Sequence, residues 1–254
     1  MTAPDGSRGA APLLRASASM IATTVLTAGA GFAFWTVAAR HWDTASVGHA
    51  AAALSAVAVV AVLSSQTVSA SLLGRMPRAA DAHGLLACGL VTTGSVALAL
   101  AVVVRAGVVP AVPALASLRT PAMTALFLLV CVAHGVAATA DAASVALRSS
   151  RVMTGRAAAH GFGKLAVVVA VAAIAPGVPA TPALLGSWTA LSIVTTARAA
   201  AVLLRLARST SEPRDRRGSP WRELLRGSAA QTVAGVGGAL PPQLLPLLVA
   251  ARAG

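Results

Sequence analysis

Seven apolar stretches, each long enough to cross a lipid bilayer as a helix, dominate this sequence. About 20 residues of α-helix span the hydrocarbon core, because each residue advances the helix by about 1.5 Å. The stretches cover residues 17–38, 45–73, 84–104, 122–147, 158–175, 183–204 and 228–250. They are too long for membrane strands and rich in Ala and Leu, and a helix satisfies its own backbone hydrogen bonds in lipid. The pattern predicts an all-α fold, a polytopic transmembrane helix bundle.

The composition agrees with this prediction. Hydrophobic residues make up 57% of the 254-residue chain, charged residues make up 11%, and the mean hydropathy is +0.79. An ordinary soluble domain carries about a quarter charged residues. The surplus of apolar side chains must therefore face a solvent other than water, and a bilayer is that solvent.

The apolar stretches and the charged segments between them divide the chain into four parts. A cytoplasmic N-terminal tail is expected at 1–16, and a first six-helix transmembrane bundle at 17–206. A basic cytoplasmic linker with a short amphipathic helix is expected at 207–227. The seventh transmembrane helix, at 228–254, is expected to open a second bundle, the rest of which is missing.

The basic residues predict the orientation of the chain. If the N-terminus is cytoplasmic, all but four of the 20 Arg and Lys residues lie on the cytoplasmic side, the exceptions being Arg40, Arg105, Arg119 and Arg252. The positive-inside rule therefore predicts a multi-pass protein of the cell membrane with its N-terminus inside. This asymmetry also accounts for the net charge of +13. Since few aromatic residues accompany the basic ones, no nucleic-acid partner is expected.

The segment between the first two apolar stretches predicts a tight turn at the membrane surface. Residues 40–43 read RHWD, and apolar residues resume directly after them. Asp43 or Thr44 is predicted to cap the second helix. Trp35 and Trp42 are expected at the level of the lipid headgroups.

Motifs for enzyme chemistry fail on inspection. Residues 161–164 (GFGK) resemble the end of a phosphate-binding loop, but Leu165 stands where Ser or Thr should follow. The five histidines lack metal-ligand spacing, and no Ser lies in a nucleophile-elbow setting. We therefore expect no enzyme activity and no cofactor. Cys88 and Cys131 are predicted to be small packing residues within helices.

Three charged residues fall inside the predicted spans, at roughly 10 Å from their cytoplasmic ends. They are Asp141, Lys164 and Arg198. Two interpretations stay open. Either Lys164 and Arg198 extend to the headgroups while Asp141 neutralises one of them, or the three line a water-filled cavity and contact an anionic headgroup.

Polar and helix-breaking residues mark two further helices. Gln66 clusters with Ser65 and Ser69 in the second helix, which indicates close helix packing or, alternatively, a cavity lining. In the seventh helix, glycines at 235–238 precede prolines at 241–246. Such interruption is typical of transporter helices that bend around a site.

Several segments follow the pattern of a known family. After the first apolar helix come AARHWDTASVGHAAAALSAVAVV and SASLLGRMPRA, with an Arg ending the first helix, an acidic turn and a Gly opening the second, and a basic stretch after it. Here those places hold Arg40, Asp43, Gly48, Arg75 and Arg78. This opening resembles the polysaccharide (O-antigen type) lipid flippases of the multidrug/oligosaccharidyl-lipid/polysaccharide exporter superfamily.

Two later segments extend the resemblance over nearly the whole chain. ALRSSRVMTGRAAAHGFGKLAVVV is similar to the family's basic turn between its fourth and fifth helices. WRELLRGSAAQTVAGVGGALPPQLLPLLVA is similar to the surface helix and seventh span that open the second half. Family members usually have two pseudo-symmetric bundles, so the chain is expected to be a truncated product or a half-transporter that needs a second half or a second copy.

The resemblance implies a mechanism. Two bundles would rock about a central cavity and move an undecaprenyl-pyrophosphate-linked glycan outward, driven by an ion gradient or the membrane potential. On that view Asp141, Lys164 and Arg198 would form the inner gate or contact the headgroup, while Gln66 and Gln231 would face the sugar.

Two alternatives to the flippase remain at this point. One is an ion-coupled drug exporter of the same superfamily. The other is a non-transporting membrane scaffold that recruits glycan-synthesis enzymes through the basic linker. Membrane lipids are expected partners in every case.

Overall fold

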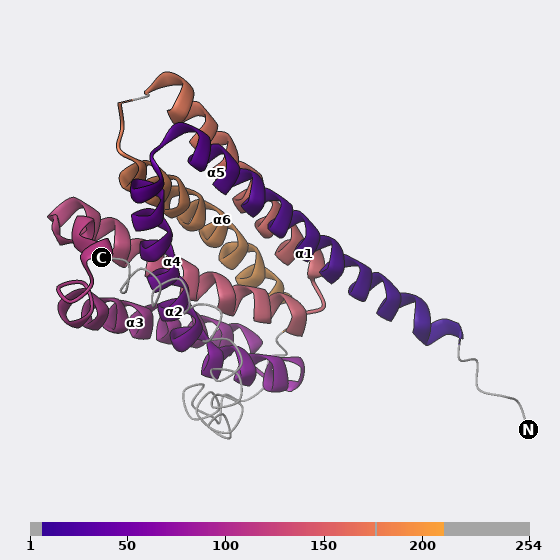
Figure 1. The fold of residues 1–254 in the computed structure, drawn as a ribbon. Helices are drawn as coiled ribbons and strands as arrows, with labels where there is room; N and C mark the ends of the chain where they lie inside the picture. Colours follow the sequence, from indigo (N-terminus) through magenta and orange to yellow (C-terminus); the bar gives the residue numbers. More distant parts are fainter. Residues whose placement is uncertain (1–6, 176, 211–254) are drawn as a thin grey trace, which may run out of the picture.

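A computed structural model describes residues 7–175 and 177–210 of the chain as a bundle of long helices (Figure 1). The described residues contain no strand, which confirms the all-α prediction. The long helices are α1 (Ser7–His41), α2 (Thr44–Arg75), α3 (Ala82–Gly107), α4 (Pro121–Ala146), α5 (Ser150–Ile174) and α6 (Ala180–Thr210), with short 3-10 helices η1 (Met76–Arg78) and η2 (Pro113–Arg119).

Each of the six long helices contains a stretch that is long and apolar enough to cross a membrane. Large apolar side chains also point outward: Phe32 is 77% exposed and Ile174 is 82% exposed. Such surface is unfavourable in water and favourable against lipid tails. The chain is therefore a multi-pass, membrane-embedded helix bundle.

The end of the chain from residue 211 lies outside the described residues. Most of the predicted linker at 207–227, the predicted helix at 228–254, and Gln231 fall there, so these expectations stay predictions. Helices α1 and α5 begin about two or more turns before their predicted apolar spans, whereas the other four begin within three residues of theirs. Helix α1 begins at Ser7 and α5 at Ser150, because the polar, basic residues that precede each span are also helical.

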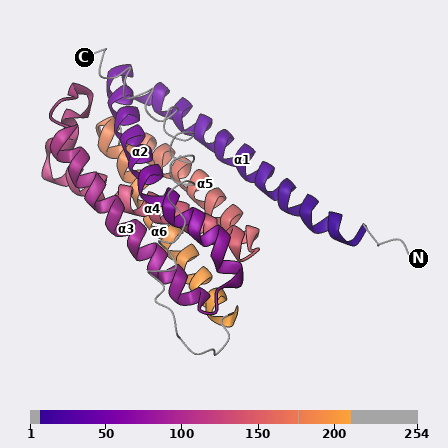
Figure 2. The ribbon, with the colours of Figure 1, turned by 90° about the horizontal axis from the view of Figure 1, so that it is seen from below.

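Helix α4 lies at the centre of the bundle, where it packs against α2, α3 and α6. Helix α5 packs against α6, and α1 lies along α5 at the edge (Figures 1 and 2). By contrast, α1 makes little contact with α2, although the two follow each other in the chain. This arrangement leaves α5 between α1 and the rest of the bundle.

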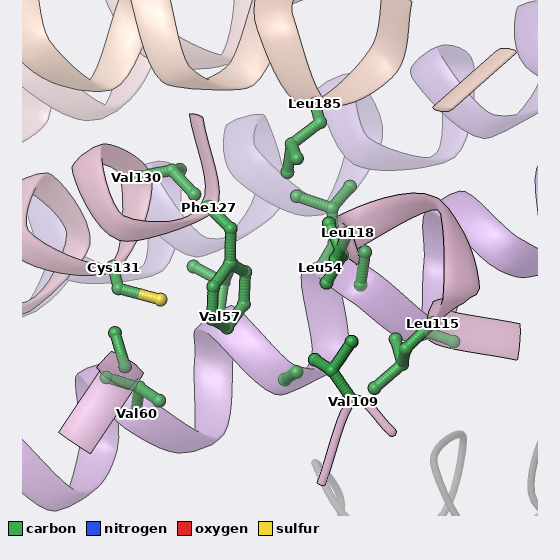
Figure 3. Close-up of a cluster of buried hydrophobic side chains, with 14 of the residues drawn as sticks. Leu54, Val57, Val60, Val109, Leu115, Leu118, Phe127, Val130, Cys131 and Leu185 are labelled. Carbon is green, nitrogen blue, oxygen red and sulfur yellow. The ribbon is translucent and has the colours of Figure 1, made fainter. Parts of the chain in front are cut away.

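The largest apolar cluster lies between α2, α4 and the 3-10 helix η2. Val57, Phe127 and Leu118 are fully buried there; Figure 3 shows Phe127 and Val57 near Cys131, and Leu118 next to Leu54. Cys88 is buried in a second cluster, and both cysteines are free thiols. The prediction that the cysteines are packing residues is confirmed.

Small residues allow α2, α3 and α4 to approach closely. Gly135 of α4 faces Ser64 of α2, and Thr93 of α3 hydrogen-bonds Thr139 of α4 with 2.9 Å between their hydroxyl oxygens. Ser64 and Thr93 are buried, and Ser64 Oγ donates to the Ala61 carbonyl at 3.1 Å. Small side chains with internal hydrogen bonds are the typical solution for helices that cross in lipid.

The turn between α1 and α2 has the predicted cap. Asp43 is the N-cap residue of α2, and its Oδ1 accepts a hydrogen bond from the Ser46 amide at 2.9 Å. Trp42 Nε1 donates to the Val178 carbonyl at 2.9 Å, which joins this turn to the loop between α5 and α6. Hydrogen bonds from the Ser46 hydroxyl and amide hold the pKa of the Asp43 carboxyl below its ordinary value.

Replacing Asp43 with Ala should lower the unfolding temperature of the protein in detergent, because the Ser46 amide loses its acceptor. Asp43→Asn, which keeps an acceptor oxygen, should lower it less. Since the pKa of Asp43 is depressed in the folded state, its ionised cap stabilises the protein above the ordinary carboxyl pKa of about 3.9. The difference in unfolding temperature between wild type and Asp43→Asn should disappear as the pH falls below the depressed pKa of Asp43, because the carboxyl group is then protonated in the folded protein. An advantage that persists unchanged in acid would contradict the cap's role.

Replacing Gly135 with Ala should destabilise the bundle by about 1 to 3 kcal/mol, because the added methyl group overpacks a helix crossing. Its carbon would lie 2.7 Å from Ser64 Oγ and 3.3 Å from Ala97 Cβ. The control is Gly94→Ala in α3, whose nearest neighbouring atom would be at an ordinary 3.5 Å. Thermal unfolding in detergent should separate the two variants, and equal stability would contradict close packing at Gly135.

Candidate functional site

Three basic side chains lie in a row along α5. Arg156, His160 and Lys164 follow one another at intervals of four residues, which places them on one face over a length of about 12 Å. The row faces α4 and α6, whose polar side chains meet it at each level. We call these residues, together with Asp141, His134, Trp188 and Ser192, the polar row.

The first level of the polar row is an ion pair between α4 and α5. Arg156 Nε donates to Asp141 Oδ1 at 2.8 Å, and a terminal guanidinium nitrogen donates to Asp141 Oδ2. The Arg156 side chain is 14% exposed and that of Asp141 is 29% exposed. The two-pronged geometry fixes the carboxylate and compensates for the removal of both charges from water. Asp141 therefore pairs with Arg156 and not with Lys164 or Arg198.

The second level is a pair of histidines. The rings of His134 in α4 and His160 in α5 lie with centroids 5.7 Å apart. Trp188 Nε1 is 3.2 Å from His134 Nε2, and Ser192 Oγ is 3.1 Å from His134 Nδ1. Because an indole N–H can only donate, Nε2 accepts, and the neutral ring carries its proton on Nδ1. Among the described residues, neither ring nitrogen of His160 has a hydrogen bond of ordinary geometry.

The third level is a lysine enclosed by aromatic rings. Lys164 is 6% exposed, and its Nζ lies 3.7 Å from the ring centroid of Trp188 and 5.2 Å from that of Phe34. Cation–π attraction of this kind replaces part of the lost hydration. Within 7–175 and 177–210, no acidic side chain forms an ion pair with Lys164. The bundle therefore holds a buried basic group whose compensation comes from aromatic faces.

A cavity of about 350 Å³ reaches the polar row from the half of the bundle that contains the α1–α2 turn. Helices α1, α2, α4 and α6 line it, and His134 and Trp188 form part of its wall. The remaining lining residues are Trp35, Ala51, Leu54, Ser55, Val57 and Ala58. The cavity thus connects the weakly packed space beside α1 and α2 to the histidine level of the row.

A second hollow, of about 460 Å³, lies between α5 and α6 and reaches the other end of the row. We call it the α5/α6 groove. Arg151, Arg156 and Arg198 line it together with Thr195. Its other lining residues are Val152, Gly155, Ala159, Leu191, Val194, Ala199 and Val202.

The structure places the five predicted site residues in different surroundings. Asp141 and Lys164 belong to the polar row. Arg198 is exposed and lines the α5/α6 groove beside Arg156. Gln66 is half-buried in α2 and lines neither hollow, while Gln231 lies outside the described residues.

The sequence-based prediction missed Arg156, His134, His160 and Trp188. One signal was available: Arg, His and Lys at intervals of four residues in RAAAHGFGK share a helix face. His134 and His160 are far apart in the chain, and they meet because α4 and α5 pack side by side. Within the described residues, no group of three or more His, Cys, Asp or Glu side chains could hold a metal ion.

Comparison of the chain with protein-family models, with curated proteins and with solved structures found no match. The polar row and the two hollows beside it are therefore the features of the chain that bear on its function.

Removing either charge of the Asp141–Arg156 pair should destabilise the bundle by about 2 kcal/mol, because a partly buried charge is left unpaired. The double variant Asp141→Asn with Arg156→Gln should be more stable than the sum of the single effects predicts. Denaturant unfolding in detergent measures the free energy of unfolding of the two single variants and of the double variant. Arg151→Gln, an exposed change on the same helix, is the control, and additive single effects would show that the pair is not coupled.

Proposed function

We propose that the chain is a membrane transporter of the polysaccharide flippase type, which moves lipid-linked glycan across the cell membrane by alternating access. The observation that carries this proposal is the polar row, which runs through the interior of an apolar bundle between two hollows. The proposed orientation has the N-terminus in the cytoplasm, in accord with the positions of the basic residues.

The energetic cost of the polar row supports a functional role. Ionisable groups inside a membrane protein are expensive, and they are found mainly along the paths of substrates and ions. Apolar side chains of similar size would stabilise a purely structural bundle at least as well. The presence of Lys164 and two histidines in the interior therefore favours a function that uses the charge of the lysine or the protons of these side chains.

The positions of the hollows support alternating access. The first residue of α2 that lines the cavity beside His134 is Ala51, about 10 Å along the helix from the α1–α2 turn. The α5/α6 groove begins at Arg151, in the first turn of α5 and hence at the opposite end of the bundle. The polar row separates these two openings, as a gate between inner and outer access would.

The chemistry of the row and the groove suits an anionic headgroup. Guanidinium and ammonium groups bind phosphate oxygens strongly, and they are supplied here by Arg156, Lys164 and Arg198. The resemblance of the opening segment to polysaccharide flippases supports the same substrate class. In this proposal a second half or a second copy completes the transport path.

Complementation of a deletion strain tests the proposal. Deletion should reduce surface polysaccharide, and the wild-type chain should restore it. Lys164→Met should lower the restored export about tenfold or more, which corresponds to the loss of one charge-assisted contact. The control Arg78→Gln removes an exposed charge outside both hollows and should restore export fully. Membrane levels of all variants are compared by immunoblot.

Other outcomes would point to the alternatives. If the deletion strain kept its surface polysaccharide but became more sensitive to drugs, the chain would be a drug exporter and not a flippase. Full export by Lys164→Met, with the deletion still defective, would favour a scaffold whose polar row has no part in transport.

A further inference from the structure

The α5/α6 groove carries positive charge that its own wall does not neutralise. Asp141 pairs with Arg156, but no acidic side chain lines the groove in the described part of the chain. Arg151 and Arg198 are exposed, and within residues 7–175 and 177–210 no acidic side chain forms an ion pair with either of them. The groove is therefore complementary to an anion.

The rest of the groove wall is apolar. Val152, Leu191, Val194 and Val202 line it, and Val194 is 64% exposed on the surface of the bundle. A small hydrated anion gains nothing from such a wall, because it must lose water there. An amphiphile fits both parts of the groove, with its anionic group at the arginines and its hydrocarbon along the valines and leucine.

The groove lies where a lipid phosphate would be found. Arg151 is in the first turn of α5, at the end of the bundle that also holds Arg75, Arg78 and Arg208. The ends of membrane-spanning helices reach the headgroup region of a leaflet. Long Arg side chains in such positions extend toward phosphates while their stems stay in the apolar layer.

We propose that the α5/α6 groove binds the phosphate of an anionic phospholipid from the leaflet at this end of the bundle. Arg151 and Arg198 hold the phosphate oxygens, and one acyl chain lies along Val194 and Val202. The volume of about 460 Å³ suits a glycerophosphate group with the first part of a chain. Arg198 is also the residue that the proposed flippase would offer to the headgroup of its cargo, but a resident phospholipid can bind there without being transported, so the inference stands whether or not the chain is a flippase.

Native mass spectrometry of the full chain tests this inference. The protein is released from nanodiscs of phosphatidylcholine that contain a minority of phosphatidylglycerol, and the retained lipids are counted. Wild type should retain phosphatidylglycerol selectively. Arg151→Gln with Arg198→Gln should weaken this retention by about fivefold for each arginine removed. The matched control, Arg75→Gln with Arg78→Gln, removes the same charge at the same end and should retain the lipid as wild type does.

A second variant tests the apolar part of the groove without changing any charge. Ala159→Phe should fill the groove and reduce retention, while its unfolding temperature shows that the bundle is intact. Equal retention by wild type and the Arg151/Arg198 variant would overturn the proposal, as would an equal loss in the Arg75/Arg78 control. Inorganic phosphate is added in a separate arm, and displacement of the lipid by millimolar phosphate would assign the groove to a free anion instead. None of these readouts measures transport.

Discussion

The contact between the ammonium group of Lys164 and the ring of Trp188 is the constraint that places α5 against α6 in this bundle. A buried Lys with no acidic partner in the described residues is unfavourable in an apolar interior unless something replaces its hydration. Trp188 and Phe34 do so, and they bring α6 and α1 to the same level of α5. Trp188 also donates to His134 on α4. The indole of Trp188, on α6, therefore contacts both α4 and α5, and the three helices that carry the polar row meet at this side chain.

Much of the fold could be predicted from the sequence because the bilayer imposes simple rules. Spans need about 20 apolar residues, and basic residues mark the turns on one side. The cap at Asp43 followed from its place before a helix, and the packing role of Cys131 from its apolar surroundings. These features depend on residues close together in the chain, so their local pattern was sufficient.

The site was harder to predict because its contacts join residues far apart in the chain. One of the two interpretations of the sequence has Asp141 neutralise Lys164 or Arg198, but Arg156, which lies before the predicted span, is part of helix α5 and forms the ion pair with Asp141 instead. The pairing of His134 with Trp188 depends on how α4 and α6 cross, which no local pattern contains. The four-residue spacing from Arg156 to Lys164 was visible in the sequence, but its partners on other helices were not.

The hydrogen bond from Trp42 to the Val178 carbonyl has a mechanical consequence. It fastens the α1–α2 turn to the α5–α6 loop, while farther along α1 packs on α5 and makes little contact with α2. Helices α1 and α5 therefore share a fixed point at the end where Trp42 lies. Any displacement of this pair of helices relative to α2 would be smallest at that point and would grow with distance along the two helices. Lys164, about halfway along α5, would lose its contact with Trp188 only if α5 also separated from α6, against which it packs.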